Sequence, residues 1–274
     1  MVVNSGHTEG AILASPGAVR SRTRSVARVA VIGLIAIGIA PYVLDIYSVN
    51  ILIRSFLYAC AALTVDVLWG YTGILTFGQS AFFGIGAYAC GLVFTHLGFS
   101  AANAVIALVL GVVVAGLVAA LVGWLAFGYG VSPIYVSVVT LALPIVVTQI
   151  LFSGGTFTGS SSGLSGFPTF DLSTEGWFWI AGGATVVLTA IGWVFVRSDA
   201  GRLLVAIREN EQRCEYLGIN TALIKTLLLV AAAVITALAG YAYAGYTDVI
   251  APELAGFVFA TELVSGSPSA GEGR

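Results

Sequence analysis

Charged residues are scarce in this sequence. Asp, Glu, Lys and Arg together make up 9% of the 274 residues, whereas soluble domains contain about 25%. None of the four occurs between Asp66 and Asp171. With 58% apolar residues and a mean hydropathy of +1.00, the chain has too few polar groups to cover a surface in water. The scarcity excludes a soluble domain, and the net charge of −2 excludes the broad basic surface that binds nucleic acid.

Residues for metal and disulfide chemistry are also few. Cys60, Cys90 and Cys214 form no C-x-x-C pair, and His7 and His96 lie far apart. Neither a disulfide framework nor a zinc site is therefore predicted.

The glycine-rich segments do not match nucleotide sites. Residues 84–89, "GIGAYA", fit G-x-G-x-x-A, but no acidic residue follows about 20 positions later and no βαβ unit is predicted. Residues 153–163, "SGGTFTGSSSG", lack the lysine of a P-loop. We expect no catalytic residue and no cofactor in this chain.

Long apolar runs, by contrast, are abundant. Runs of about 20 residues are long enough to cross a bilayer as helices. They predict an all-α polytopic membrane protein, a helical bundle of about seven to eight transmembrane spans, with one transmembrane domain over residues 26–264. The predicted spans are 28–48, 49–69, 76–95, 101–127, 133–152, 176–196 and 225–246, with an eighth that begins near residue 255.

Positive charge indicates the orientation. The polar, arginine-rich tail of residues 1–25 leads into an apolar run longer than the 7–15 residues of a signal-peptide core, and no A-x-A-like cleavage site follows. We interpret this run as a retained first span. Because Lys and Arg stay on the cytoplasmic side, residues 1–25 and 197–224 are expected in the cytoplasm. The loop 153–175, which has no Lys or Arg, is expected outside.

Charge concentrates in residues 201–220, "GRLLVAIRENEQRCEYLGIN". Leu203, Leu204 and Ile207 share one apolar face, which Cys214 and Leu217 continue irregularly. Gly218 offers a helix stop, and Asn220 or Thr221 could cap the next helix. The segment predicts one or two short helices on the cytoplasmic surface. The alternative is a solvated loop whose arginines only fix the topology.

Residues 70–91 form a second unusual segment. Six glycines interrupt an apolar run that also holds Thr72, Thr76, Gln79 and Ser80. Backbone that leaves the helical form inside a membrane must be buried or line a cavity, so we expect a broken or re-entrant helix near 70–88 on a substrate path. The alternative is an unbroken helix whose glycines only allow close packing.

Three motifs resemble the LivM-type permeases of branched-chain amino acid ABC importers. Residues 70–88, "GYTGILTFGQSAFFGIGAY", resemble the family's G-Y-x-G-x-x-S-x-G-[HQ]-A-x-F-F-G-I-G-A-Y, and residues 158–168, "TGSSSGLSGFP", its T-G-G-x-x-G-L-x-G-[IV]-P. Residues 201–244 look like its cytoplasmic loop and following span. One departure is residues 212–214, Gln-Arg-Cys, where the family often has two alanines.

The resemblance implies a multi-pass permease subunit of the cell (inner or plasma) membrane that imports branched-chain amino acids, with its N-terminus in the cytoplasm. The implied partners are a second, LivH-like permease subunit, two cytoplasmic ATPase subunits that hold the ATP, an external substrate-binding protein and the lipid bilayer. Residues 197–224 are then the loop that couples to an ATPase. The implied coupling residues are Arg202, Arg208, Glu209, Glu211, Arg213, Glu215 and Gly218, and the implied substrate-path residues are Gly73, Gly78, Gln79, Ser80, Phe83 and Gly86.

Other functions compete with this interpretation. A urea or short-chain amide permease of the same family would share its motifs. An ion-coupled secondary transporter would need acidic residues within the membrane, and the charge-free stretch 67–170 argues against it. An intramembrane enzyme is disfavoured because no nucleophile–base pair or metal cluster is apparent.

The end of the chain departs from the family pattern. The family continues with an apolar helix and a Gly-Gly-x-Gly-[ST] turn, whereas this chain turns polar after Val264, too early for the last span to cross a bilayer. Written in GC-rich codons and read two bases later, residues 264–274 give Leu-Gly-Val-Ala-Leu-Gly-Gly-Arg-Gly-Thr, which contains that turn. We therefore expect a frameshift near residue 263 or 264, a mutation or a sequence error, with residues 265–274 outside the family.

Overall fold

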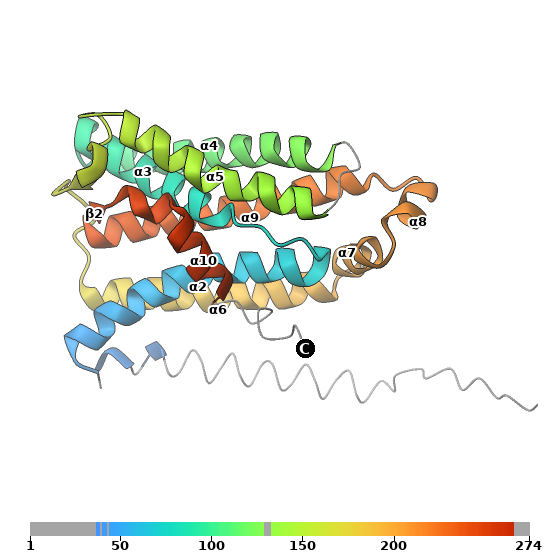
Figure 1. Ribbon diagram of the computed structural model, residues 1–274. Coiled ribbons are helices and arrows are strands. Elements are labelled where there is room, and N and C mark those ends of the chain that lie inside the picture. The colour runs from blue at the N-terminus through green and yellow to red at the C-terminus, as the bar shows by residue number, and fades with distance from the viewer. Residues whose placement is uncertain (1–36, 39, 43, 129–132, 266–274) are drawn as a thin grey trace, which may run out of the picture.

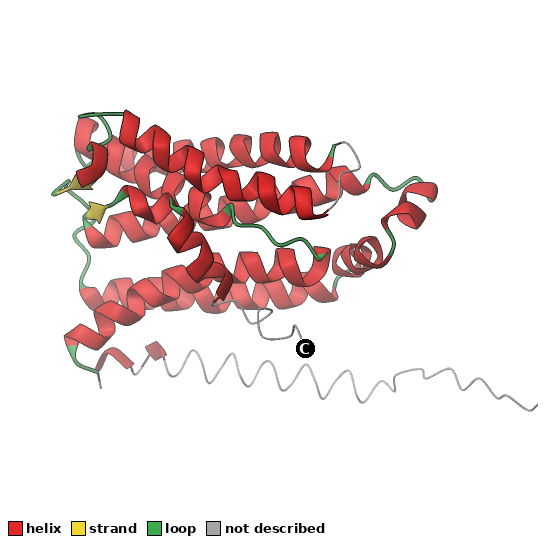
Figure 2. Ribbon diagram, viewed as in Figure 1, coloured by secondary structure: helices red, strands yellow, loops and turns green. Residues whose placement is uncertain are grey.

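The computed structural model describes residues 37–265 except 39, 43 and 129–132. Within them the chain is almost entirely helical (Figures 1 and 2). This confirms the prediction of an all-α polytopic membrane protein. Six helices of the described part are long and apolar enough to cross a membrane: α2 (Ile46–Thr72), α3 (Gln79–Leu97), α4 (Ala101–Phe127), α5 (Pro133–Ser153), α6 (Thr174–Arg197) and α9 (Thr221–Thr247).

Short elements lie at both ends of the bundle. Figure 1 shows α7 (Asp199–Glu209) and α8 (Glu211–Tyr216) at one end and β2 (Val249–Ile250) at the other. The second end also holds β1 (Leu164–Ser165), which follows η1 (Ser160–Ser162). The segment after β2 forms η2 (Pro252–Ala255), which reaches the start of α3, where Ser80 Oγ donates to the carbonyl oxygen of Ala255 at 3.4 Å. β1 pairs with β2 in antiparallel register, so the 153–175 loop is joined to the segment after α9. The last described helix is α10 (Phe257–Ser265).

One predicted span boundary differs from the structure. The predicted boundary between residues 48 and 49 is wrong, because α2 already begins at Ile46, with Asp45 extended at the N-cap. The eighth span, predicted to begin near residue 255, corresponds to α10, which begins at Phe257. Its nine described residues extend about 14 Å at 1.5 Å per residue.

Some predictions fall outside the described residues. These are the cytoplasmic tail 1–25, most of the first span and, from residue 266 onward, the segment attributed to a frameshift. The frameshift stays a prediction.

α3 and α9 form the centre of the bundle. In the apolar stretch of α3, 72% of the residues are buried, against 11% in α6. A methyl group on Gly86 would lie 2.0 Å from the carbonyl oxygen of Ala237, and one on Gly240 would lie 2.0 Å from that of Phe83. Glycine on both helices thus brings the two backbones into contact, as small residues do within membranes. The outer helices α4, α5 and α6 expose large apolar side chains instead.

Candidate functional site

Residues 73–78 form a non-helical segment between α2 and α3. In Figure 1 this segment runs from the end of α2 beside α7 toward the middle of the bundle, where α3 begins. α2 ends because Gly73 has a left-handed backbone (φ 70°), and its N–H donates to the carbonyl of Trp69 at 3.0 Å. The expected break in the 70–88 region is therefore present, and we call residues 73–78 the break.

The break is tolerated because α5 pairs with its backbone. Ser137 Oγ donates to the carbonyl oxygen of Leu75 at 2.8 Å, and the N–H of Phe77 donates to Thr140 Oγ1 at 3.4 Å. Ile74 is 4% exposed and packs in a cluster with Val136. Irregular backbone at membrane depth requires such burial and pairing. α5 therefore supplies side chains that pair with and cover the backbone of the break.

A chain of buried polar side chains joins α2 and α9 to the start of α3. Thr236 Oγ1 lies 2.9 Å from both Thr64 Oγ1 and Gln79 Oε1. Gln79 Nε2 and Thr76 Oγ1 have no partner among the described residues, although both side chains are only 1% exposed. A buried donor left unpaired costs about 1–3 kcal/mol. Groups of this kind indicate a water, ion or ligand that completes them.

α5 contains a proline, Pro144, within its helix. Pro144 has no N–H to donate to the carbonyl of Thr140 four residues earlier. That carbonyl oxygen lies 3.7 Å from the position of a methyl group on Gly78. The N–H groups of Gln79 and Ser80, in the first turn of α3, have no backbone acceptor in the part described, as is usual at a helix start. Donors at the positive end of a helix therefore lie beside a carbonyl acceptor.

The predicted path residues divide into two groups. Gly73, Gly78, Gln79 and Ser80 lie at or next to the break. Phe83 and Gly86 instead lie within the α3–α9 core.

The surroundings of Phe83 are aromatic. Its ring centroid lies 5.1 Å from Phe259, 5.5 Å from Tyr243 and 5.7 Å from Tyr58. Phe83 and Gly86 thus have a packing role, and a role of any of the six in transport stays a prediction.

A groove of about 430 Å³ lies between α2, α6 and α9. Its walls are largely apolar, and its polar lining includes Thr64, Asp66 and Thr189. Thr64 also belongs to the buried polar chain, which connects the groove to the start of α3. Sequence reasoning missed this groove because its walls are largely ordinary apolar residues of the three helices. The only sequence signal for it was an acidic residue, Asp66, within a span.

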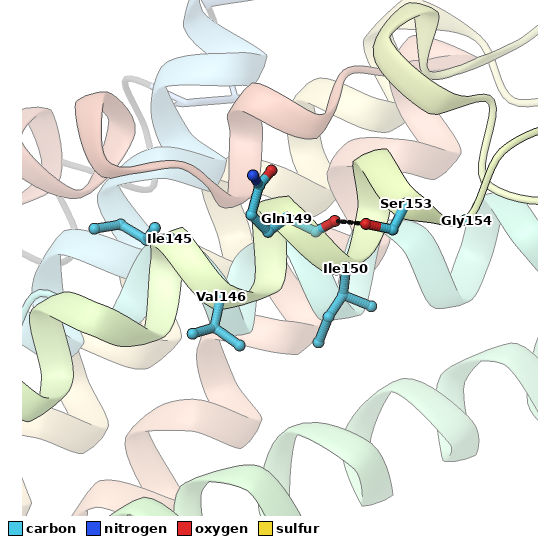
Figure 3. Close-up of a pocket in the computed structure, with 6 residues that line it drawn as sticks. All are labelled: Ile145, Val146, Gln149, Ile150, Ser153 and Gly154. Carbon is cyan, nitrogen blue, oxygen red and sulfur yellow. Dashed lines mark hydrogen bonds between the residues drawn. The ribbon is translucent and has the colours of Figure 1, made fainter.

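A shallower hollow of about 460 Å³ lies on the outer face of α5 (Figure 3). Figure 3 shows Gln149 pointing away from the aliphatic side chains, and Ser153 Oγ donates to the Gln149 carbonyl at 2.8 Å. Its lining lacks the convergent polar groups of a small-molecule site, so we do not assign it to the substrate. The lining residues are Ile145, Val146, Gln149, Ile150, Ser153 and Gly154.

Residues 199–216 form the two short helices expected at the charged segment. Ser198 caps α7 by accepting from the N–H of Gly201 at 3.4 Å, and Asn210 caps α8 by accepting from that of Arg213 at 2.9 Å. Leu204 and Ile207 are each 2% exposed. The prediction of one or two short helices with an apolar face is confirmed.

The helix boundaries predicted after α8 are also present. Gly218 has φ 82°, and Asn220 caps α9 by accepting from the N–H of Leu223 at 3.0 Å. These two residues end the charged segment where the sequence indicated.

Three predicted coupling residues are engaged within the chain. Arg208 Nη1 donates to the carbonyl oxygen of Gly70 at the end of α2. Glu211 forms an ion pair with Lys225, whose side chain is 10% exposed. Glu215 accepts from Thr221 Oγ1 at 3.1 Å. These side chains hold α7 and α8 to the bundle.

The remaining coupling residues face outward. Arg202, Glu209 and Arg213 are exposed, and the ion pair of Arg202 with its neighbour Asp199 is exposed too. Within the described structure, these three charged side chains thus do not join α7 or α8 to the bundle.

The end of α8 exposes apolar side chains. Tyr216 is 87% exposed and Leu217 is 80% exposed, next to each other. The expectation that Leu217 continues the apolar face is wrong, because Leu204 and Ile207 on that face are buried and Leu217 is not, whereas Cys214 is buried as expected. No sequence pattern indicated the exposure of Tyr216. Two adjacent exposed apolar side chains at a bundle end suit a protein contact.

Comparison with known proteins places the chain in a family. The family model described as branched-chain amino acid transport system / permease component matches residues 47–264. The high-affinity branched-chain amino acid transport system permease protein LivM of Salmonella typhimurium is 27% identical over 260 residues, covering 83% of this chain and 59% of the relative. The LivM of Escherichia coli is 24% identical over 262 residues, covering 84% and 59%. No solved structure matches.

The chain thus spans 59% of the length of both relatives. The residues that match the family model include the break, the buried polar side chains at the start of α3 and both short helices. The chain belongs to the family of permease components of branched-chain amino acid transport systems.

Proposed function

We propose that this chain is the permease subunit of an ABC importer for branched-chain amino acids in the cell membrane. ATPase subunits dock on α7 and α8, a second permease subunit completes the translocation path, and an external binding protein delivers the substrate. The chain itself hydrolyses nothing. The observation that carries the proposal is the break with its unpartnered buried donors, in a chain of this family.

The chemistry of the break supports an amino acid as substrate. The start of α3 offers N–H groups and a positive helix end, which favour a carboxylate. The Thr140 carbonyl beside Gly78 offers an acceptor for an ammonium group. Apolar surface adjoins both, since Leu143 lies within 3.3 Å of a methyl group on Gly78 and the rings of Phe77 and Phe257 are 6.3 Å apart. An aliphatic amino acid presents these three features, whereas urea has neither charge.

Replacing Thr76 with valine tests the path. Thr76→Val keeps the volume of the side chain and removes a hydroxyl that has no partner in the described structure, so stability should stay unchanged or rise. Uptake of leucine by the assembled transporter should fall by about tenfold, the effect of one lost hydrogen bond to a charged group.

Thr226→Val is the matched control, because the Thr226 hydroxyl donates to the carbonyl of Ala222 within α9. Uptake should remain near normal in that variant. Equal uptake by Thr76→Val and the unsubstituted chain would show that Thr76 does not line the path. Saturable uptake of urea but not of leucine would show that the substrate is urea and not an amino acid.

Substitutions at the apolar end of α8 test whether an ATPase subunit docks there. Tyr216→Ala combined with Leu217→Ala should weaken co-purification of the ATPase subunit by roughly thirtyfold, since buried aromatic anchors contribute about 2 kcal/mol to interfaces. The double substitution Phe157→Ala and Leu172→Ala is the control, because it removes exposed apolar side chains from the opposite end. Undiminished ATPase binding by the α8 variant would show that this surface is not the docking site.

A further inference from the structure

The side chain of Arg208 reaches from α7 to the C-terminal end of α2. Its Nη1 donates to the carbonyl oxygen of Gly70, and its Cγ lies 3.4 Å from the position of a methyl group on Gly73. α2 has no basic residue in its own last turn, and the last carbonyls of a helix lack intrahelical partners. Arg208 therefore completes the end of α2 from another element, by a hydrogen bond and by its charge.

α7 cannot move independently of the neighbouring helices. Leu204 and Ile207 are buried, and a methyl group on Gly201 would lie 2.2 Å from the carbonyl oxygen of Val196 at the end of α6. A displacement of α7 is therefore passed to the ends of α2 and α6. Arg208 is the side chain that carries it to the residue at which the break begins.

A few hydrogen bonds hold the break beyond Gly73. The N–H of Ile74 donates to Thr72 Oγ1 of α2 at 3.4 Å, and Ser137 and Thr140 of α5 form one further bond each with the backbone of the break. Its far end is the start of α3, where Gln79 has an unpaired donor within the described structure. The conformation of these residues therefore depends on both α5 and the anchored end at Gly73.

We propose that Arg208 is a positioning residue that transmits the movement of α7 to the break and thereby couples the ATPase-facing helices to the substrate path. The proposal rests on the proposed function, but the contact it invokes can be tested without any partner. Arg208 thus acts through the backbone of Gly70 and the turn at Gly73, without contact to the substrate or the ATPase.

The first experiment measures the break in the chain alone, reconstituted in lipid nanodiscs. Cys60, Cys90 and Cys214 are replaced with alanine, and Thr76→Cys reports exposure to a membrane-permeant maleimide. Arg208→Ala should raise the labelling rate by about tenfold, the factor expected for loss of one charge-assisted hydrogen bond, and Arg208→Lys should give a smaller increase. Arg202→Ala is the matched control, because in the described part of the chain the ion pair of Arg202 is with exposed Asp199. Equal labelling of Arg208→Ala and the control overturns the proposal.

A second variant tests the same contact if Arg208→Ala does not insert into the membrane. Gly73→Ala strains the left-handed turn and crowds the Arg208 stem, so it should raise labelling in the same way. Where both single variants insert, their effects should be non-additive, because the two residues share one contact. Additive effects would show that the two residues act separately and would overturn the proposal.

The second experiment measures coupling in the complete transporter. Arg208→Ala should retain the bound ATPase and increase the ATP hydrolysed per substrate imported by at least about threefold relative to the unsubstituted transporter, the lower range of a coupling energy. Increased labelling with an unchanged ratio would leave Arg208 as a helix cap only and overturn its role in coupling. If no ATPase binds the unsubstituted chain, the proposed function fails, and the labelling experiment alone decides whether Arg208 positions the break.

Discussion

Glycine decides how closely α3 and α9 approach. A methyl group on Gly86 would overlap the backbone of α9 at Ala237, and backbone cannot move aside as a flexible side chain can. We expect Gly86→Ala to prevent the two helices from packing, with a large loss of monodisperse protein after extraction in detergent. Gly183→Ala in α6 is the control, because nothing lies within 4 Å of its added methyl group and alanine favours a helix by about 1 kcal/mol. A normal yield of Gly86→Ala would mean that the approach of α3 and α9 is looser than the structure has it.

The residues that could be predicted from the sequence act over short distances along the chain. Gly218 and Asn220 follow local rules for helix ends, and both do so here. Arg208 bonds to Gly70, 138 positions away, and no local pattern indicates such a partner. The family resemblance implied that the charged segment faces a partner protein, whereas Arg208, Glu211 and Glu215 hold part of it to its own bundle.

At the scale of helices, too, local features of the break could be predicted from the sequence and its distant partners could not. Its glycines and the family resemblance indicated that helix is lost near 70–88, because glycine density marks irregular or closely packed backbone. They did not indicate which helix would pair with the exposed backbone. Ser137 and Thr140, which do so, look like ordinary small polar residues in an apolar run. Only the folded arrangement places α5 against residues 73–78.

α8 and α9 are linked by charge at the bundle end. Lys225 contacts the carboxylate of Glu211 and lies 5.9 Å from the centre of the Phe127 ring. The ammonium group therefore has both an anion and an aromatic face within reach. This arrangement joins α8 to α9 and, through Phe127, to α4. The exposed apolar end of α8 is thereby held to the central helix α9.

The two ends of the whole molecule differ in positive charge. Arg197, Arg202, Arg208 and Arg213 lie in the segment that forms or borders α7 and α8, while the 153–175 loop at the opposite end has neither Lys nor Arg. Positive residues are retained in the cytoplasm during insertion. We therefore expect α7 and α8 in the cytoplasm and the loop outside, the arrangement that a cytoplasmic ATPase and an external binding protein require.

Cysteine labelling in intact cells tests this orientation. In a chain whose Cys60, Cys90 and Cys214 are replaced with alanine, Ser162→Cys should react with a membrane-impermeant maleimide, because Ser162 is exposed in the loop expected outside. Arg213→Cys, exposed on α8, should react only after the membrane is permeabilised. The opposite pattern would place α7 and α8 outside and exclude them as the docking site of a cytoplasmic ATPase. Reaction of both positions in intact cells would mean that the chain inserts in two orientations, which the charge difference between the ends should prevent.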